Sequence, residues 1–320
     1  MNNKLLEQLS AARSVAVGGH VRPDGDCVGS CMGVYHYIKD NYPQTQVTVY
    51  LEEVPESYKI IRDTDRIVTD DSAEVYPDLF IAVDCSDKER LGKFAAYFDH
   101  AAKTICIDHH ISNTGYADEN IIFPQASSTC EVLCDLFDDD KVGLDAANSL
   151  YMGIICDTGC FKHTSTSEHT MLAAGRLISK GVHTENIMDR VFFEKTYVQN
   201  RLLGRCLMDS LLYMEGKVIV GIVTREIFDE FHAVYSDLEG VIDQFRQTRG
   251  TLAAILLSEN ADGSWKLSMR SKDGVNVADI AVSYGGGGHI KAAGATVYKQ
   301  PQTVINEIIE KIGAQLKDND

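Results

Sequence analysis

The sequence predicts an α/β protein with two domains, the larger N-terminal one built on a doubly wound, mainly parallel sheet. Three observations lead to this prediction. The chain has 320 residues, more than one average domain holds. Its first half alternates short apolar runs with segments of helical spacing, which is typical of a parallel sheet covered by helices. Its last third shows a different succession of strands and helices, which indicates a smaller second α/β domain.

Composition places the chain among ordinary globular proteins with a sizeable core, since 44% of its residues are hydrophobic and 24% are charged. No apolar run approaches the ~20 residues that a membrane helix requires, and the first residues lack the apolar stretch of a signal peptide. The nine cysteines are an odd number and lie mostly inside apolar segments, which favours reduced thiols. We therefore expect a cytoplasmic protein without membrane contacts, either a monomer or a homodimer.

The formal net charge of −17 bears on binding partners. Long nucleic acids are bound largely through many Lys and Arg contacts, and this chain has no run rich in those residues. Long duplex nucleic acid is therefore excluded as a partner. A small phosphorylated molecule needs only a local positive site, and metal ions can supply it.

The first strand is expected at residues 14–19, where small and branched apolar residues form a short run. A tight loop follows, because Pro23 and Gly25 stand close together. Residues 27–40 carry apolar side chains at helical spacing, and Asp26 is the residue expected to cap that helix.

Three further apolar runs are expected to form strands of the same sheet, at residues 46–51, 79–84 and 104–108. The second ends in Asp84, and the third ends in the triplet Asp108-His109-His110. In open α/β sheets, ligands bind at the carboxyl ends of the strands. These acids and imidazoles therefore stand where chemistry is expected.

From residue 127 onward the spacing becomes helical. An amphipathic run ends at Phe137, and Glu131 is placed to complete a capping box at its start. Two more helices are expected at residues 146–156, just before Asp157, and at residues 168–179.

The pattern predicts three parts. Residues 1–185 form the catalytic domain, residues 186–212 a helical connector, and residues 213–320 the smaller domain. Helical spacing runs through the connector from about residue 185 to 212. In the smaller domain we expect strands at 217–223, 251–257 and 265–269, and helices at 276–284 and 302–316, with a glycine-rich run at 285–288.

Acids and histidines recur at the ends of these elements. In a parallel sheet the strand ends meet along one edge, so residues that the sequence scatters can converge there. Closely packed carboxylates repel one another unless cations lie among them. Carboxylates with imidazoles suit two divalent ions of the Mn²⁺ type better than sulfur-rich zinc coordination does. Two such ions ~3.5–4 Å apart can lower the pKa of a shared water and neutralise the charge of a phosphate. The residues in question are His20, Asp24, Asp26, Asp84, Asp108, His109, His110 and Asp157.

Each of these residues also has an ordinary structural explanation. Asp26 alone could be a helix cap, Asp84 a turn former at the end of a strand, and His20 a loop histidine bonded to backbone. Only their combination points to a metal centre.

Five motifs, in order along nearly the whole chain, resemble those of the DHH-family phosphoesterases with a DHH-associated C-terminal domain, and in particular the nanoRNase/pAp phosphatase type. They are HVRPDGDCVGS at 20–30, VD at 83–84, DHH at 108–110, GIICDTG at 153–159 and GGGHIKAAG at 286–294.

The resemblance implies two Mn²⁺ ions, with Mg²⁺ or Co²⁺ as alternatives. It implies that one ion is held by His20 and Asp24, the other by Asp26, His109 and Asp157, and that Asp84 bridges the two.

For catalysis, the resemblance places His110 beside the substrate phosphate, as a proton donor or a charge stabiliser. Asp108 would orient a neighbouring histidine. One departure is Cys85, where relatives often carry a hydroxyl residue. The sequence therefore does not predict the hydrogen bond that such a hydroxyl would make to a metal-binding side chain, but the metal ligands themselves are unaffected.

The resemblance also implies substrate contacts in the smaller domain. Glycines allow backbone N–H groups to approach an anion closely, although a run of four can also be a flexible loop. Arg270 has forked donors that suit a phosphate, and the plain alternative is a solvated charge at the end of a strand. The expected contacts are Arg270, Ser271, Gly286, Gly287, Gly288 and His289, with Arg90 and Ser128 as further candidates.

Together these expectations describe a Mn²⁺-dependent phosphoesterase with substrate between its domains and the connector as a hinge. It would hydrolyse short RNA to nucleoside 5′-monophosphates and remove the 3′-phosphate of pAp by means of a water activated by two metals. The alternative is hydrolysis of pApA or c-di-AMP at the same site. A single-strand exonuclease would need basic tracks that this chain lacks. The glycine-rich segment argues against an inorganic pyrophosphatase, and the intact ligand set argues against a non-hydrolysing nucleotide sensor.

Overall fold

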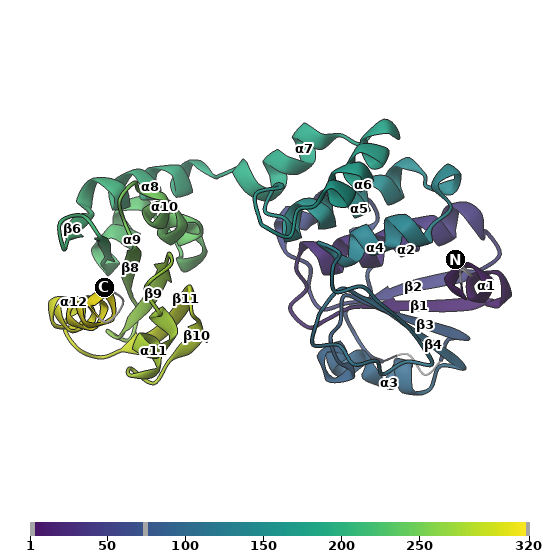
Figure 1. Ribbon diagram of the computed structural model, residues 1–320, viewed down its shortest axis with the longest axis horizontal. Coiled ribbons are helices and arrows are strands. Elements are labelled where there is room, and N and C mark those ends of the chain that lie inside the picture. The colour runs from purple at the N-terminus through teal and green to yellow at the C-terminus, as the bar shows by residue number, and fades with distance from the viewer. Residues whose placement is uncertain (1–3, 73–75, 318–320) are drawn as a thin grey trace. The chain divides into compact units, whose positions relative to one another are not determined.

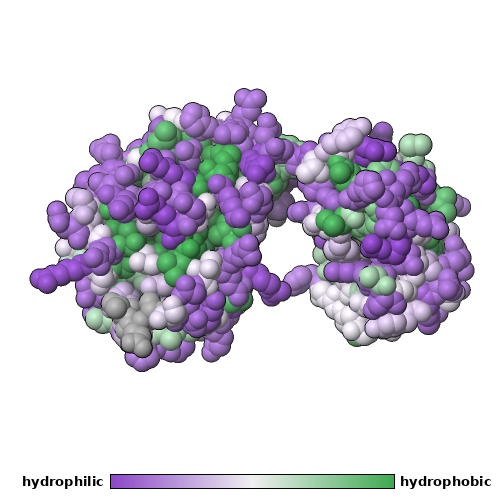
Figure 2. Space-filling view, turned by 180° about the vertical axis from the view of Figure 1, so that it is seen from behind, coloured by the Kyte–Doolittle hydropathy of each residue, from purple (hydrophilic) through white to green (hydrophobic). Residues whose placement is uncertain are grey.

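The computed structural model describes residues 4–72 and 76–317 (Figure 1). By its internal contacts the chain divides after Glu194 into two compact units, each of which is an α/β structure. On the face shown in Figure 2, hydrophilic residues cover most of each unit and apolar residues surface only in patches. None of the helices in the described ranges combines the length and the apolar composition needed to cross a membrane.

The first unit is built on a five-stranded sheet in the order β2-β1-β3-β4-β5, in which all neighbouring strands are parallel. This confirms the predicted parallel sheet, although β5 was not anticipated. The strands are β1 (Ser14–Gly18), β2 (Gln46–Tyr50), β3 (Leu79–Val83), β4 (Lys103–Asp108) and β5 (Glu119–Ile122).

Helices cover both faces of this sheet because side chains alternate along each strand. Ile81 belongs to the core formed with α2 (Gly25–Asn41), α4 (Thr129–Leu136) and α5 (Leu144–Asp157). Its neighbour Phe80 belongs to the opposite core, formed with α3 and the 3₁₀ segment before it. The remaining helical elements of this unit are α1 (Lys4–Ala11), α3 (Ala95–Asp99), α6 (Glu168–Ser179), α7 (Thr184–Met188), a π-helical turn (Asp189–Phe193) and 3₁₀ segments Glu56–Ile60, Thr64–Arg66, Lys88–Phe94 and Asp139–Lys141.

Two helix starts differ from the expectation. Asp24, not Asp26, caps α2, and its carboxylate accepts hydrogen bonds from the N–H groups of Asp26 and Cys27. The expected capping box at α4 is incomplete, because the carboxylate of Glu131 accepts from Ser127 N–H, one residue before the Ser128 cap. Both carboxylates accept hydrogen bonds from residues far along the chain instead, that of Asp26 from Thr129 N–H and that of Glu131 from the hydroxyl of Thr170.

The expected helical run from about residue 185 to 212 is also interrupted. After the π-helical turn, Glu194 is extended, and Thr196 starts a new helix, α8 (Tyr197–Asp209), through a capping box with Gln199. The run then ends in a strand, β6 (Leu211–Tyr213). A capping box stops one helix from continuing into the next because it fixes its first residue in an extended conformation.

The second unit has a six-stranded mixed sheet in the order β10-β11-β9-β8-β7-β6, in which only β7 and β8 are parallel neighbours. One face packs on α8, α9 and α10, and the other on α11 and α12 (Figure 1). The glycine run is not a free loop, since part of it forms β10. The elements not yet given are β7 (Val218–Val223), β8 (Ala253–Glu259), β9 (Trp265–Ser271), β10 (Gly287–His289), β11 (Ala292–Val297), α9 (Arg225–Phe231), the 3₁₀ segment Tyr235–Leu238, α10 (Val241–Gln247), α11 (Val277–Val282) and α12 (Pro301–Lys317).

The close packing of α2 on α5 can be tested at Gly29. A Cβ added there would lie 2.6 Å from the carbonyl oxygen of Ser149 and 2.9 Å from the nitrogen of Gly153. We expect Gly29→Ala to lower the free energy of unfolding by about 1–3 kcal/mol through overpacking. The control is Gly175→Ala in α6, where the added methyl meets nothing within 4 Å. It should raise stability by about 0.5–1 kcal/mol. Urea unfolding followed by circular dichroism measures both, and an unchanged midpoint for Gly29→Ala would contradict the packing.

Candidate metal centre

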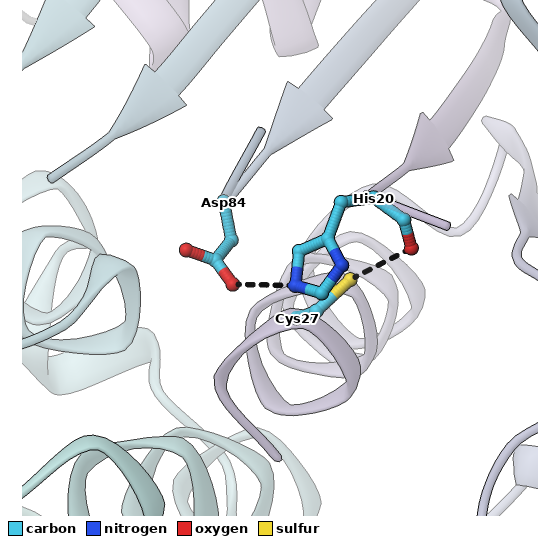
Figure 3. Close-up of side chains that lie close together, drawn as sticks. All are labelled: His20, Cys27 and Asp84. Atoms are coloured by element: carbon cyan, nitrogen blue, oxygen red, sulfur yellow. Dashed lines mark hydrogen bonds and ion pairs between the residues drawn. The ribbon is translucent and has the colours of Figure 1, made fainter. Parts of the chain in front are cut away.

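His20 lies between two carboxylates just after β1. Its Nδ1 is 2.9 Å from the carbonyl oxygen of Val21, which leaves Nε2 facing Oδ2 of Asp24 and Oδ2 of Asp84, each at 3.5 Å. Figure 3 shows the ring directed at Asp84, with the sulfur of Cys27 beside the ring. Metal-binding imidazoles commonly donate their other N–H to a carboxylate, a backbone carbonyl or a water, which fixes the orientation of the ring.

His109 forms a second group with the remaining acids. Its Nε2 lies 3.2 Å from Oδ2 of Asp157, 3.6 Å from Oδ1 of Asp84 and 4.0 Å from Oδ2 of Asp26. Asp84 therefore presents one carboxylate oxygen to His20 and the other to His109. This is the placement that a bridging carboxylate requires.

The start of α4 fixes the two buried acids. Oδ2 of Asp26 accepts a hydrogen bond of 2.7 Å from Thr129 N–H, and Oδ1 accepts one of 3.0 Å from Cys130 N–H. The hydroxyl of Thr129 donates to Oδ1 of Asp84 at 3.2 Å. The unpaired N–H groups at a helix N-terminus stabilise negative charge. Sequence reasoning missed Thr129 because its only local signal was that of a helix start.

Burial and mutual repulsion raise the pKa of Asp26 well above its ordinary value, and burial likewise raises that of Asp84. For Asp24, burial would also raise the pKa, but the hydrogen bonds from His20 and Cys27 N–H outweigh it and lower it. Burial alone would lower the pKa of both imidazoles. The carboxylates outweigh it, raising the pKa of His20 to about 11 and that of His109 to about 10.

These residues fit divalent cations. Four carboxylates face two imidazoles in a largely buried place, which is a donor set of oxygen and nitrogen suited to hard or intermediate ions. Within residues 4–72 and 76–317, three groups bring their candidate ligand atoms within 4.8 Å of one another, namely His20–Cys27–Asp84, Asp84–His109–His110 and Asp26–His109–Asp157.

Cys27 belongs to one of these groups but is better described as a wall of the site. Its thiol points to the carbonyl oxygen of His20 at 3.9 Å, and burial raises its pKa well above the ordinary value. A protonated thiol is a poor metal ligand, because the thiolate is the binding form.

His110 is held by a chain of hydrogen bonds that runs away from the metal centre. Its Nδ1–H donates to Oδ1 of Asp108 at 2.7 Å, and Oδ2 of Asp108 accepts from the side-chain amide of Asn113, also at 2.7 Å. The hydrogen bond to Asp108 raises the pKa of His110. Asn113 was not anticipated, since one asparagine after the triplet carries no distinctive spacing.

At Cys85 the thiol donates to the carbonyl oxygen of Asp87 at 3.1 Å, and the backbone makes the contacts to Asn113 and Tyr116. The Cys85 carbonyl oxygen accepts from the amide of Asn113 at 3.2 Å and from the hydroxyl of Tyr116 at 2.9 Å. Any residue at this position supplies that carbonyl, so the contact does not depend on a hydroxyl side chain.

The two further candidates of the first unit differ from each other. Ser128 is fully buried and its hydroxyl accepts from Glu131 N–H, so its side chain serves as a helix cap rather than as a surface for substrate. Arg90 lies in the 3₁₀ segment after β3, and its carbonyl oxygen accepts from Val21 N–H at 2.7 Å. Arg90 is thus tied to the loop that carries His20.

Arg270 and His289 lie on one face of the second sheet. Both pair with Ala292 of β11, Arg270 from β9 and His289 from β10, and paired residues of antiparallel strands point to the same face. Nε of Arg270 is 3.5 Å from Oδ1 of Asp243 in α10. Ser271, by contrast, is buried and donates to the carbonyl oxygens of Val275 and Ile290, so it shapes the strand end and is not exposed to a ligand.

The glycines of this segment are required by close backbone packing. A Cβ at Gly286 would lie 2.1 Å from the carbonyl oxygen of Gly294, and one at Gly288, where φ is +142°, would lie 2.5 Å from that of Ala292. Gly287 meets nothing within 4 Å. Two of the three glycines therefore serve the hairpin between β10 and β11, and the small residues leave an open surface beside His289.

Comparison with known proteins gives matches in both units. Residues 14–154 match the DHH family, N-terminal domain, and residues 215–318 match the DHHA1 domain. Curated relatives include the bifunctional oligoribonuclease and PAP phosphatase NrnA of Thermus thermophilus (27% identical, covering 92% of this chain and 87% of the relative) and that of Bacillus subtilis (27%, covering 93% and 94%). The cyclic-di-AMP phosphodiesterase PdeA of Listeria monocytogenes is 26% identical over 92% of this chain, which spans 46% of that protein.

Among solved structures, an exopolyphosphatase-related protein from Bacteroides fragilis superposes with a TM-score of 0.83, at 22% identity, over 98% of this chain and 96% of that one. The likeness shows that the two chains share a fold.

The raised imidazole pKa values predict how the metal-free protein responds to pH. A group whose pKa is raised on folding contributes stability that is complete below its unfolded pKa, about 6.5, and is lost as the pH rises towards the folded value. With chelator present, the free energy of unfolding should therefore fall from pH 6.5 to 8.5, by at most about 1.4 kcal/mol per pH unit for each imidazole, and the melting temperature should fall with it. His109→Gln should flatten this profile, and saturating Mn²⁺ should restore stability at pH 8.5. His100→Gln, at an exposed imidazole, is the control. A flat profile for the chelated protein would contradict the prediction.

Proposed function

This chain belongs to the DHH family of phosphoesterases, with a DHHA1 domain in its second unit, and on that premise we propose that it hydrolyses short RNA to nucleoside 5′-monophosphates and removes the 3′-phosphate of pAp to give AMP. Relatives of nearly the same length carry the name of both activities. The observation that carries the proposal is the placement of Asp84, whose two carboxylate oxygens face two different imidazoles.

The proposed centre holds two divalent ions, Mn²⁺ in the first place and Mg²⁺ or Co²⁺ as alternatives. When bound, such ions supply the positive charge that activates a water molecule and neutralises the phosphate. The ligands of one ion would be His20, Asp24 and Asp84, and those of the other Asp26, Asp84, His109 and Asp157.

His110 is the proposed proton donor to the leaving oxygen. Asp108 accepts from Nδ1–H of its ring and so fixes the ring orientation and favours the charged imidazolium. The proton at Nε2 is then available to an oxygen that gains negative charge as the phosphate ester breaks. Asn113 keeps the Asp108 carboxylate in place through its second oxygen.

The second unit is proposed to hold the nucleotide end of the substrate. Arg270 and His289 offer donors on the same sheet face, and the small residues between them leave room for a flat ligand. Arg270 pairs with Asp243 only loosely at 3.5 Å, so its forked donors can turn to a phosphate. The net charge of −17 disfavours a long polyanion and so supports short substrates.

A second candidate is hydrolysis of pApA or of c-di-AMP itself. It is favoured by the relatives named cyclic-di-AMP phosphodiesterase from Listeria monocytogenes and Geobacillus thermodenitrificans. Each aligns with 92% of this chain, at 26% and 25% identity respectively. This chain spans only 46% of each of those proteins, whereas it spans most of the relatives named for oligoribonuclease and PAP phosphatase activity.

A turnover panel with Mn²⁺ tests the proposal. It compares pAp, pApA, c-di-AMP, RNA of two to five nucleotides, longer single strands and pyrophosphate. We expect the short RNAs and pAp to turn over fastest. Asp84→Asn should lower turnover more than about 100-fold, because it removes the carboxylate proposed to bridge the two ions. Loss of a residue that only orients a ligand typically costs about 10–100-fold. Asp99→Asn, at a surface ion pair with Lys88, is the matched control. Substantial turnover by Asp84→Asn, or turnover confined to pyrophosphate or long strands, would reject the proposal.

Arg270→Ala tests the role of the second unit. We expect KM for dinucleotides to rise about 10-fold or more, the effect of losing hydrogen bonds worth about 1.5–3 kcal/mol to a charged group. Mn²⁺ affinity should not change. Arg270→Lys should recover only part of the loss, since lysine lacks the forked donors. Arg246→Ala is the matched control, because Arg246 also lies near Asp243, at 3.7 Å. An unchanged KM in Arg270→Ala would remove the proposed phosphate contact.

A further inference from the structure

The chain makes an unusual turn directly after Asp157. Gly159, Cys160 and Phe161 are all in the left-handed region, with φ values of +55°, +55° and +63°. For residues other than glycine this conformation costs roughly 1–2 kcal/mol each. Two such residues in succession persist only where their surroundings hold them, and such strain collects at functional sites.

Hydrogen bonds of Thr158 stabilise this left-handed turn. This residue is fully buried, its hydroxyl donates to the carbonyl oxygen of Ile154 at 2.6 Å, and the same hydroxyl accepts from Phe161 N–H at 3.1 Å. The carbonyl oxygen of Thr158 accepts from the N–H groups of Lys162 and His163, both at 2.9 Å. These bonds close the end of α5 over the left-handed turn.

The ring of His163 also stabilises the turn. Its Nδ1 lies 3.1 Å from the carbonyl oxygen of Asp157, to which it donates. The ring lies against Gly159, where an added Cβ would come within 2.6 Å of Nε2. His163 is exposed, so burial of apolar surface does not explain why its ring is folded back on this carbonyl.

The residue that His163 contacts is one of the proposed ligands. Asp157 is the last residue of α5, and its side-chain Oδ2 is 3.2 Å from Nε2 of His109. A hydrogen bond to the carbonyl oxygen restrains the rotation of this last peptide group, and with it the direction of the Asp157 side chain. The contact does not require a charged imidazole, since one N–H at Nδ1 is enough.

We propose that His163 is a positioning residue that aims the Asp157 carboxylate at the ligand group of Asp26 and His109, with Gly159 leaving room for its ring. The inference rests on the proposed two-ion centre. It assigns His163 to one of the two ions only, because neither His20 nor Asp24 belongs to this turn. A residue that merely ended a helix would affect the stability of the fold, and not the affinity for one ion.

The test is a Mn²⁺ titration by calorimetry and electron paramagnetic resonance, without substrate. For His163→Leu we expect the affinity for one ion to fall 10–100-fold, as for other residues that orient a ligand, while the affinity for the other ion stays unchanged. His163→Asn should recover most of the loss, because its amide N–H can take the place of Nδ1–H. Lys162→Leu, at the exposed neighbouring residue, is the control and should bind both ions as the parent chain does.

Gly159→Ala gives an independent approach to the same contact. Its methyl group should displace the His163 ring and weaken the same ion, and adding it to His163→Leu should produce little further loss. Unchanged affinities in His163→Leu, equal weakening of both ions, or failure of His163→Asn to recover the loss would each overturn the assignment. If the parent chain hydrolyses short RNA while His163→Leu binds both ions normally, the positioning role fails alone. If the selective loss occurs in a chain that hydrolyses none of the panel, the proposed function fails and the positioning role stands.

Discussion

The structure of the site depends on one carboxylate, that of Asp84. It follows the fully buried strand β3, and its backbone N–H extends the ladder to β4 by donating to Ile107 at 3.0 Å. Its φ of +53° turns the chain sharply, so that the side chain stands at the sheet edge between His20 and His109. A buried carboxylate is costly unless it is paired and hydrogen-bonded. The loop after β1, the triplet after β4 and the start of α4 all supply such partners.

The residues that build the fold and those that build the site are largely the same. Asp24 uses one oxygen to cap α2 and directs the other at His20. Asp26, in the first turn of that helix, is buried against the N–H groups of Thr129 and Cys130, more than a hundred residues later. Its carboxyl group thus fastens the start of α4 to α2, and the two hydrogen bonds give this buried polar group the partners that a stable core requires.

Sequence reasoning reached the parallel sheet and the edge on which acids and histidines gather, because side-chain period and strand ends are local properties. It assigned the α2 cap to Asp26, since two aspartates so close together have the same local propensity and only the distant Thr129 distinguishes them. Glu131 was misjudged for a similar reason, because its carboxylate also binds Thr170 of α6. Glycine has a low propensity for strands, so the local sequence did not predict β10. The strand forms because the small residues of β11 allow its backbone to pair with that of β10. The capping box Thr196–Gln199 indicates that a new helix begins at this point of the chain. The helical spacing on either side led to the prediction of one continuous helical run instead.

The electrostatics of the first unit couple the binding of the proposed ions to proton release. Asp24, Asp26, Asp84 and Asp157 surround two imidazoles whose raised pKa values keep them protonated at neutral pH, so in the metal-free chain the imidazolium rings of His20 and His109 already offset the acids. Divalent ions would take the place of the protons at Nε2 of these rings, because only a neutral imidazole binds a metal, so proton release is coupled to the binding of the proposed ions. Arg270 of the second unit carries a charge that depends on no ion. The proposed nucleotide contact and the proposed metal centre therefore draw on separate charges, so the part of the substrate affinity that comes from Arg270 would not require a bound ion.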